Sequence, residues 1–272
     1  MSPLEPFEIY AIRYASMDRR GDEVFIGGDP HAGPIGMDYF VWVVLGKRQS
    51  FIVDTGFDAE TAARRGRKFL RCPAESLKHL GLDAREIKDV IITHMHYDHI
   101  GNFNRFPRAT FHLQDREMAY ATGRHMCHPA MNGAFDVENV VGLVREVYRG
   151  RVRFHDAPAE LAPGLTLHPL GGHSAGLQVV RVWTRRGWMV LASDASHYYA
   201  NMEEGRVFPI VYHVGDALEG YRRLRELASS PAHIIPGHDP QVMNRYQAPK
   251  RELEGIIVRL DEEPEEVSRA KP

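Results

Sequence analysis

The sequence has few cysteines, little net charge and no long apolar run. Its 272 residues include only Cys72 and Cys127, too few for a disulfide framework and in keeping with a reducing compartment. The formal net charge of −2 shows no excess of positive charge of the kind that binds nucleic acid or an anionic membrane. The densest apolar run, Phe40 to Leu45, is far shorter than the ~18 residues that span a bilayer. The first residues, MSPLEPFEIY, lack the basic and apolar regions of a secretory signal, so we expect a cytoplasmic protein.

Short apolar runs alternate with turn signals and helical stretches along nearly the whole chain. With 43% hydrophobic and 26% charged residues and no break in composition, this pattern favours one α/β domain over residues 1–272. Strands are expected at Phe7–Tyr14, Tyr39–Leu45, Ser50–Asp54, Asp89–Thr93, Thr110–Leu113, Val152–Phe154, Leu165–His168, Gln178–Trp183, Trp188–Ser193 and His233–Ile235. Helices are expected at Ala59–Arg71, Pro73–Leu80, Asp115–Thr122, Val137–Tyr148 and Ala217–Ser229.

Three local features complete this expected architecture. Arg185–Gly187 separates two predicted strands and indicates a hairpin turn, and Asp216 is the expected N-cap of the last helix. Between about residues 115 and 150 lies an insertion with an irregular middle, which predicts a loop or lid. The tail from Lys250 is predicted to be a charged, solvated helical stretch.

The chain contains 15 histidines, and three of them lie within six positions, after the apolar run that starts at Val90. The motif is His94-x-His96-x-Asp98-His99. In extended backbone, residues i and i+2 point to the same side, so His94 and His96 can hold one ion together. If the chain then turns into a helix, Asp98 and His99 swing away and can hold a second ion nearby. Isolated surface or core histidines do not explain this spacing.

Three more candidate ligands each follow a strand-like run and enter a turn of small residues. They are His173, Asp194 and His238. As a set they complete two nitrogen and oxygen sites, one with His94, His96 and His173, the other with Asp98, His99 and His238. Asp194 has two carboxylate oxygens and can bridge the two sites. Strand ends at one edge of a sheet are where ligands converge in α/β proteins.

The motif, the order of these residues and the upstream run Phe51-Ile-Val-Asp-Thr-Gly56 resemble the metallo-β-lactamase superfamily. The resemblance covers roughly residues 7–239. It implies an αββα sandwich of two mixed sheets flanked by helices, with a dinuclear metal site at one edge. Asp54 would orient ligands rather than bind a metal; its alternative is a plain turn aspartate.

The ligand set also discriminates among the branches of this superfamily. An aspartate at position 194 is unlike many true β-lactamases, which have cysteine there. A histidine at position 96 is unlike the oxygen-reducing di-iron relatives, which usually have glutamate at this second position of the motif. The compact chain and the segment Asp194-Ala-Ser-His-Tyr-Tyr199 resemble the N-acyl homoserine lactonases. The resemblance therefore implies a quorum-quenching lactonase, with a glyoxalase II-like thioester hydrolase as the alternative.

The implied mechanism is attack on a cyclic ester by a hydroxide that bridges two divalent ions. Zinc is the default for these ligands, with manganese, iron and cobalt also allowed. Asp98 would both bind a metal and carry a proton to the leaving alkoxide. The sequence departs from the lactonases because His197 replaces the tyrosine expected three residues after the bridging aspartate. His197 or Tyr198 would therefore stabilise the oxyanion.

The candidates for the substrate pocket are Met, His and aromatic residues in the N-terminal loop and the central insertion. For each of them, ordinary packing in the protein is the alternative interpretation. These candidates are Phe25, His31, Met37, Tyr39, Met126 and His128. The expected partner is a small lactone, with no nucleic acid or membrane; a homodimer is compatible with this hypothesis. A metal-binding module without activity and an iron redox enzyme remain as competing hypotheses.

Overall fold

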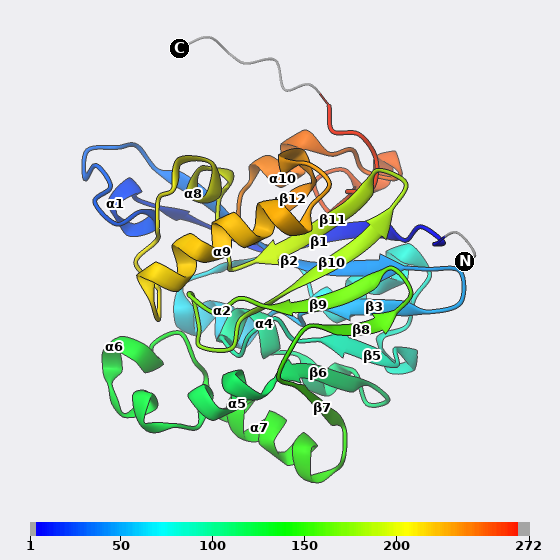
Figure 1. Cartoon of the computed structure of the whole chain (residues 1–272), viewed down its shortest axis with the longest axis horizontal. Coiled ribbons are helices and arrows are strands. Elements are labelled where there is room, and N and C mark those ends of the chain that lie inside the picture. Colours follow the sequence, from blue (N-terminus) through cyan, green and yellow to red (C-terminus); the bar gives the residue numbers. More distant parts are fainter. Residues whose placement is uncertain (1–3, 266–272) are drawn as a thin grey trace.

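The computed structural model describes residues 4–265 and contains two β-sheets that pack face to face between helices (Figure 1). The larger sheet has the order β13-β1-β2-β3-β5-β6-β7, with β4 paired to β1. Its strands are β1 (Glu8–Arg19), β2 (Ile35–Leu45), β3 (Ser50–Val53), β4 (Lys68–Phe69), β5 (Asp89–Ile91), β6 (Thr110–Gln114), β7 (Val152–His155) and β13 (Ile257–Arg259).

The smaller sheet has the order β12-β11-β10-β9-β8. Its strands are β8 (Ala159–Ala162), β9 (Leu165–Pro169), β10 (Gln178–Thr184), β11 (Gly187–Ser193) and β12 (Ile234–Pro236). Strands β3, β5, β6 and β7 run parallel to one another, whereas β1, β2 and β13 pair antiparallel. In the smaller sheet β11 and β12 are parallel and the other pairs antiparallel. Both sheets are therefore mixed, as predicted.

Strand β2 shows how the layers follow from the sequence. Its side chains alternate between the two faces of the sheet, and both faces are covered, so nearly the whole strand is apolar. One set packs between the two sheets: Phe40, Trp42 and Val44. The other set packs beneath the helices of the outer layer: Tyr39, Val41 and Val43. This alternation produces two hydrophobic layers, one on each side of the larger sheet.

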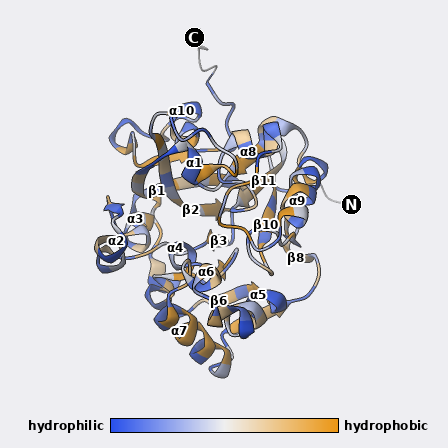
Figure 2. Cartoon of the chain, turned by 90° about the vertical axis from the view of Figure 1, so that its left-hand side faces the viewer, coloured by the Kyte–Doolittle hydropathy of each residue, from blue (hydrophilic) through white to orange (hydrophobic). Residues whose placement is uncertain are grey.

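Helices cover the outer faces of both sheets. Those of more than one turn include α2 (Ala59–Arg65), α5 (Asp115–Ala121), α7 (Val137–Tyr148), α8 (Tyr199–Glu204), α9 (Val214–Leu227) and α10 (Gln241–Arg245). Shorter ones are α1 (Gly21–Val24), α3 (Pro73–Ser76), α4 (Tyr97–Ile100) and α6 (Pro129–Asn132), with 3-10 turns at Leu77–Leu80, Ala84–Glu86, Phe103–Arg105, Arg124–Cys127, Pro231–His233 and Arg251–Leu253. In Figure 2, α2 and α3 lie on one side of the strands and α9 lies on the opposite side. Among residues 4–265, no helix has the length and apolar character needed to cross a bilayer.

The predicted strands are all present, but three predicted helices differ. The stretch expected as one helix over Pro73–Leu80 is α-helical only to Ser76 and continues as a 3-10 turn. The helix expected to run to Arg71 ends at Arg65, because Gly66 adopts the left-handed conformation and the chain then pairs with β1. Helix α9 begins earlier than expected: its N-cap is His213, whose Nδ1 accepts a hydrogen bond from the Asp216 amide at 3.0 Å. The predicted hairpin turn is confirmed, since Gly187 has a φ of 97° between the antiparallel β10 and β11.

The prediction of a solvated helix from Lys250 is wrong. After a single 3-10 turn the chain forms β13, which pairs antiparallel with β1 in the register Ala11↔Val258. Both Ile257 and Val258 are buried. Burial of their apolar side chains therefore determines the structure of this segment, although its charged neighbours suggested solvent exposure. The end of the predicted tail lies outside the described residues.

The central insertion has more regular structure than its sequence suggested. Its expected loop contains a 3-10 turn at Arg124–Cys127 and the short helix α6. Action of this segment as a lid, and a single domain over residues 1–272, stay predictions.

Burial of Trp42 between the sheets gives a stability prediction. We expect Trp42→Ala to lower the free energy of unfolding by about 3–5 kcal/mol, because the large cavity removes packing from both sheets. Trp42→Phe should cost less, since the indole Nε1 has no hydrogen-bond partner within residues 4–265. Urea unfolding at fixed metal content measures both. Tyr148→Ala is the matched control, because Tyr148 is 90% exposed, and a loss there equal to that of Trp42→Ala would contradict the prediction.

Candidate metal centre

The histidine motif lies at the end of β5, where the chain leaves the larger sheet. His94 and His96 belong to an extended segment, and His96 is the N-cap residue of the short helix α4. Asp98 and His99 lie in the first turn of α4. The sequence therefore places two side chains before the helix and two within it, as the spacing predicted.

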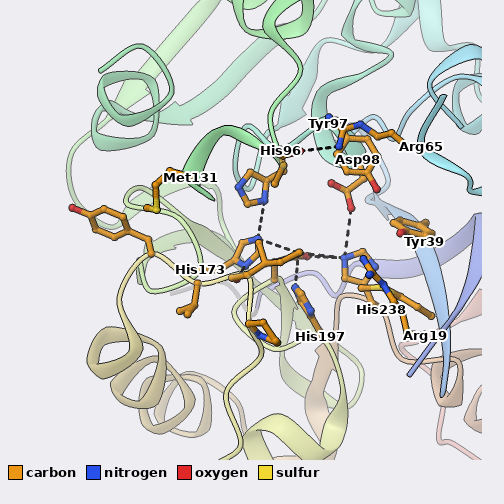
Figure 3. Close-up of a pocket in the computed structure, with 18 of the residues that line it drawn as sticks. Arg19, Tyr39, Arg65, His96, Tyr97, Asp98, Met131, His173, His197 and His238 are labelled. Atoms are coloured by element: carbon orange, nitrogen blue, oxygen red, sulfur yellow. Dashed lines mark hydrogen bonds and ion pairs between the residues drawn. The ribbon is translucent and has the colours of Figure 1, made fainter. Parts of the chain in front are cut away.

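The first cluster brings His94 and His96 together with His173 from the turn after β9. Figure 3 shows His96 and His173 next to each other. His173 Nε2 lies 3.1 Å from His94 Nε2 and 2.9 Å from His96 Nδ1. His173 Nδ1 donates to the Ile210 carbonyl oxygen at 2.8 Å, which leaves Nε2 with its lone pair. Ring nitrogens of three buried imidazoles thus converge on one point.

Burial keeps these three imidazoles neutral. It lowers the pKa of His94 and of His96 well below the usual histidine value, and lowers the pKa of His173 to about 3. A neutral imidazole is the form that binds a metal ion. The donor set of this cluster therefore fits a divalent cation such as zinc.

The second cluster consists of Asp98, His99 and His238, the last from the turn after β12. His238 Nδ1 donates to the Asp38 carbonyl oxygen at 2.8 Å, and its Nε2 lies 3.9 Å from Asp98 Oδ2. His99 Nε2 is buried and has no hydrogen-bond partner within residues 4–265. The carboxylate oxygen Asp194 Oδ1 lies 3.3 Å away without hydrogen-bond geometry, so a cation at this position would give the buried nitrogen a partner.

Asp194, at the end of β11, lies between the two clusters. Its Oδ2 is 3.3 Å from His173 Nε2, and its Oδ1 is 3.3 Å from His99 Nε2. Burial raises the pKa of this carboxyl, but the imidazoles of His238 and His99 outweigh burial and hold the pKa well below the usual range. His238 Nε2 lies 3.2 Å from both oxygens, so the ionised carboxylate contacts ligands of both clusters.

Backbone strain accompanies the turn that carries Asp194. Ser193 has a φ of 44°, a conformation that residues with a side chain rarely adopt. Gly237 packs against this turn, and a Cβ at position 237 would lie 2.7 Å from the Ser193 backbone and 2.8 Å from Asp194 Oδ1. Only glycine therefore lets the β12 turn approach the Asp194 carboxylate this closely.

Asp54 lies outside the second cluster and contacts His99, one of its members. Its carboxylate accepts hydrogen bonds from the Thr93 amide and hydroxyl, both at 2.8 Å, and lies 2.7 Å from His99 Nδ1. It thereby orients His99 with Nε2 directed toward Asp194. Asp54 thus contacts His99 without belonging to either cluster, and its role in orienting a metal ligand stays a prediction.

Glu117 on α5 supports the first cluster and was not predicted. This fully buried carboxylate accepts hydrogen bonds from the Met95 amide at 2.8 Å, the Ser174 hydroxyl at 2.7 Å and the Gly176 amide at 2.9 Å. It therefore ties the loop of His94 and His96 to the loop of His173. A glutamate in a predicted amphipathic helix looks like a solvated residue, so no local signal distinguishes it.

A cavity of about 280 Å³ opens onto both clusters. Of the predicted pocket residues, Met37 and Tyr39 line it. His197 also lines it, stacks on Phe208 at 3.6 Å and places its Nε2 2.9 Å from Asp194 Oδ2.

Other predicted site residues lie away from this cavity. Phe25 and Tyr198 pack against each other with ring centroids 5.9 Å apart. The Tyr198 hydroxyl has no hydrogen-bond partner within the described residues, and burial raises its pKa. His31 and His128 are exposed, and Met126 packs against the outer hydrophobic layer. The sequence reasoning also missed three arginines that line the cavity: Arg19, Arg65 and Arg67.

Comparisons with known proteins agree with this architecture. Among solved structures, a quorum-quenching N-acyl homoserine lactone lactonase superposes with a TM-score of 0.74 at 21% identity, covering 89% of this chain and 95% of that one. An N-acyl homoserine lactone hydrolase with the product N-hexanoyl-L-homoserine bound at its catalytic metal centre also gives 0.74, at 20% identity, covering 89% and 96%. At these identities the likeness shows the fold.

Sequence relatives extend the comparison. A protein of Mycobacterium tuberculosis named probable metallo-hydrolase is 24% identical over an alignment of 220 residues that covers 71% of this chain and 68% of that protein. The N-acyl homoserine lactonase AttM of Azorhizobium caulinodans is 27% identical over an alignment of 190 residues that covers 65% of this chain and 66% of AttM. The family model of the metallo-beta-lactamase superfamily matches residues 36–238, from β2 to the last histidine of the second cluster. The chain therefore belongs to the metallo-beta-lactamase superfamily and is a metal-dependent hydrolase of that family.

Proposed function

We propose that this hydrolase opens a lactone to a hydroxy acid with the help of two divalent cations, most simply zinc. The observation that carries the proposal is the position of Asp194, whose carboxylate contacts His173 of the first cluster and His99 and His238 of the second. The choice of a lactone rests on the relatives and structural neighbours that are named N-acyl homoserine lactonases.

The first cation would be held by His94, His96 and His173, the second by Asp98, His99 and His238, with Asp194 shared between them. Two cations in these positions would lower the pKa of a water molecule and polarise the ester carbonyl.

Asp98 is suited to the proton transfer that ring opening requires. When water adds to the carbonyl carbon and the ring C–O bond breaks, the leaving alkoxide needs a proton. The Asp98 carboxylate lines the cavity, so it can take a proton from the attacking water and give it to the alkoxide. We therefore assign Asp98 both a ligand role and a proton-carrying role.

His197 is the better placed of the two candidates for an oxyanion donor. Its imidazole lines the cavity, whereas the Tyr198 ring packs against Phe25. His197 Nε2 also lies 2.9 Å from Asp194 Oδ2, so the imidazole helps to orient the shared carboxylate. A neutral imidazole has a single N–H, so His197 could stabilise the developing oxyanion only with Nε2 released from Asp194, as binding of that carboxylate to the cations would allow.

The metal content tests the ligand assignment. Protein saturated with zinc and then desalted should contain about two ions per chain by elemental analysis. Asp194→Ala should reduce this number, because the substitution removes an oxygen from both clusters. The control is Asp89→Ala, which removes a carboxylate 3.0 Å from His112 Nε2 at a site outside both clusters. One ion or none in the unmodified protein would contradict the dinuclear site.

The reaction class is tested with a panel of substrates on the zinc-loaded protein. We expect γ-butyrolactone or N-hexanoyl homoserine lactone to be opened, with the released proton followed by a pH indicator. S-lactoylglutathione and a β-lactam serve as comparison substrates. Turnover of the thioester without turnover of any lactone would replace the proposal with a thioester hydrolase, and no turnover of lactones by protein with two ions would refute it.

The oxyanion donor is tested by comparing His197→Ala with Tyr198→Phe on the best substrate. Loss of one such donor typically lowers turnover by about 10²–10³-fold. A fall of that size in one variant only identifies the donor, and the cavity lining favours His197. Elemental analysis must first confirm that both variants keep their metal ions. Unchanged turnover in both would mean that neither side chain polarises the carbonyl.

A further inference from the structure

Three arginine side chains line the cavity beside the proposed metal centre. Arg19 is the last residue of β1, Arg65 is the last residue of α2, and Arg67 follows between α2 and β4. In Figure 3, Arg19, Arg65 and Tyr39 lie on the same side of the cavity, next to Asp98 and His238. The chain as a whole carries a formal charge of −2, so this concentration of positive charge is a local feature.

The register of the first hairpin places Arg19 at the cavity. Met17 pairs with Met37 across β1 and β2, so Arg19, two residues further along β1, shares a face with Met37. Within residues 4–265 the guanidinium of Arg19 makes no hydrogen bond and no ion pair. The adjacent Arg20, on the other face, instead pairs with Asp22 at 2.9 Å.

Arg65 and Arg67 are held in place by neutral groups. Arg65 donates to the carbonyl oxygens of Gly133 and Phe135, each at 2.9 Å, and lies 3.8 Å above the Tyr97 ring. Arg67 Nε donates to the Tyr97 hydroxyl at 3.0 Å, and its Nη1 donates to the Arg65 carbonyl oxygen at 2.6 Å. Within the described residues no carboxylate pairs with either guanidinium, and Arg67 Nη2 has no acceptor.

The acidic groups of the cavity do not balance these charges. The only carboxylates among its described lining residues are Asp98 and Asp194, and both are assigned to the cations. With two divalent ions bound, the wall that carries the three arginines therefore keeps its full positive charge. Arginine side chains held with free N–H groups are the usual partners of carboxylate and phosphate oxygens.

The opposite side of the cavity is apolar. In Figure 3, His96 and His173 lie between Met131 and the arginines. Ile210 and Tyr212 also line the cavity. The cavity volume of about 280 Å³ is at the lower end of the range for ligand pockets, so a compact substrate fits best.

We propose that the substrate carries an anionic oxygen group, a carboxylate or a phosphate, which Arg19 and Arg67 bind while the ester lies at the metal centre. This inference rests on the proposed lactonase function and narrows its substrate to an acidic lactone rather than a neutral one. Arg65 is a positioning residue here, because both of its Nη atoms already donate to the backbone.

The test compares matched lactones on the zinc-loaded protein. One pair is the lactone of 2-hydroxyglutarate and its primary amide, and the other is 5-(hydroxymethyl)-γ-butyrolactone phosphate and the free alcohol. We expect kcat/KM to favour the anionic member of at least one pair, and the pair that shows it distinguishes a carboxylate from a phosphate. Arg19→Gln and Arg67→Gln should each reduce that preference about 10-fold, mainly through KM, because a hydrogen bond to a charged group is lost. Arg19→Lys should retain more of it.

Arg20→Gln is the control, because its side chain pairs outside the cavity and its loss should leave the preference intact. Equal kcat/KM within both pairs, or a preference that survives both arginine substitutions, overturns the inference while the lactonase proposal stands. If no lactone is opened although two ions are bound, the lactonase proposal fails instead. The anion site is then judged by calorimetric binding of glutarate and glutaramide: tighter binding of glutarate that Arg19→Gln abolishes supports it, and equal binding overturns it.

Discussion

Five imidazole nitrogens surround the carboxylate of Asp194 in a region that is almost fully buried. They belong to His94, His99, His173, His197 and His238, at 2.9–3.9 Å. Burial lowers the pKa of His94 and His173, so neutral ring nitrogens crowd one another there. At His99 and His238 the Asp194 carboxylate outweighs burial and raises the pKa. Cations at the two clusters would replace these protons and accept the lone pairs of the ring nitrogens. Because these side chains come from turns of both sheets, the same cations would also join the edges of the two sheets and stabilise the folded chain.

The geometry of the site depends on groups that would not touch a cation. Asp54 orients His99, and Glu117 ties together the loops that carry the first three histidines. Gly237 permits the β12 turn to approach Asp194. Each of these contacts is buried and specific, so the ligand positions are largely set by the protein before any ion is bound.

The sequence predicted the parts of the fold and site that depend on local pattern. Alternating or continuous apolar runs located the strands, and the spacing from His94 to His99 gave the division into two clusters. The β13 strand was missed because it is short and follows charged residues, although its pairing with β1 buries Ile257 and Val258. Glu117 and Arg19 could not be found in this way. Their roles arise from contacts with residues distant in sequence, and each looks locally like an ordinary charged surface residue.

The order of the ligands along the chain affects when the site can form in a cell. The first cluster is supplied by residues 94–173, but the second requires His238, which follows β12 and comes after all the other candidate ligands. A nascent chain on the ribosome therefore exposes the His94–His99 segment well before its last partner has been synthesised. Until then the exposed imidazoles can bind any available transition metal with an incomplete ligand set. A ligand set for two cations would therefore be complete only after β12 has joined the smaller sheet.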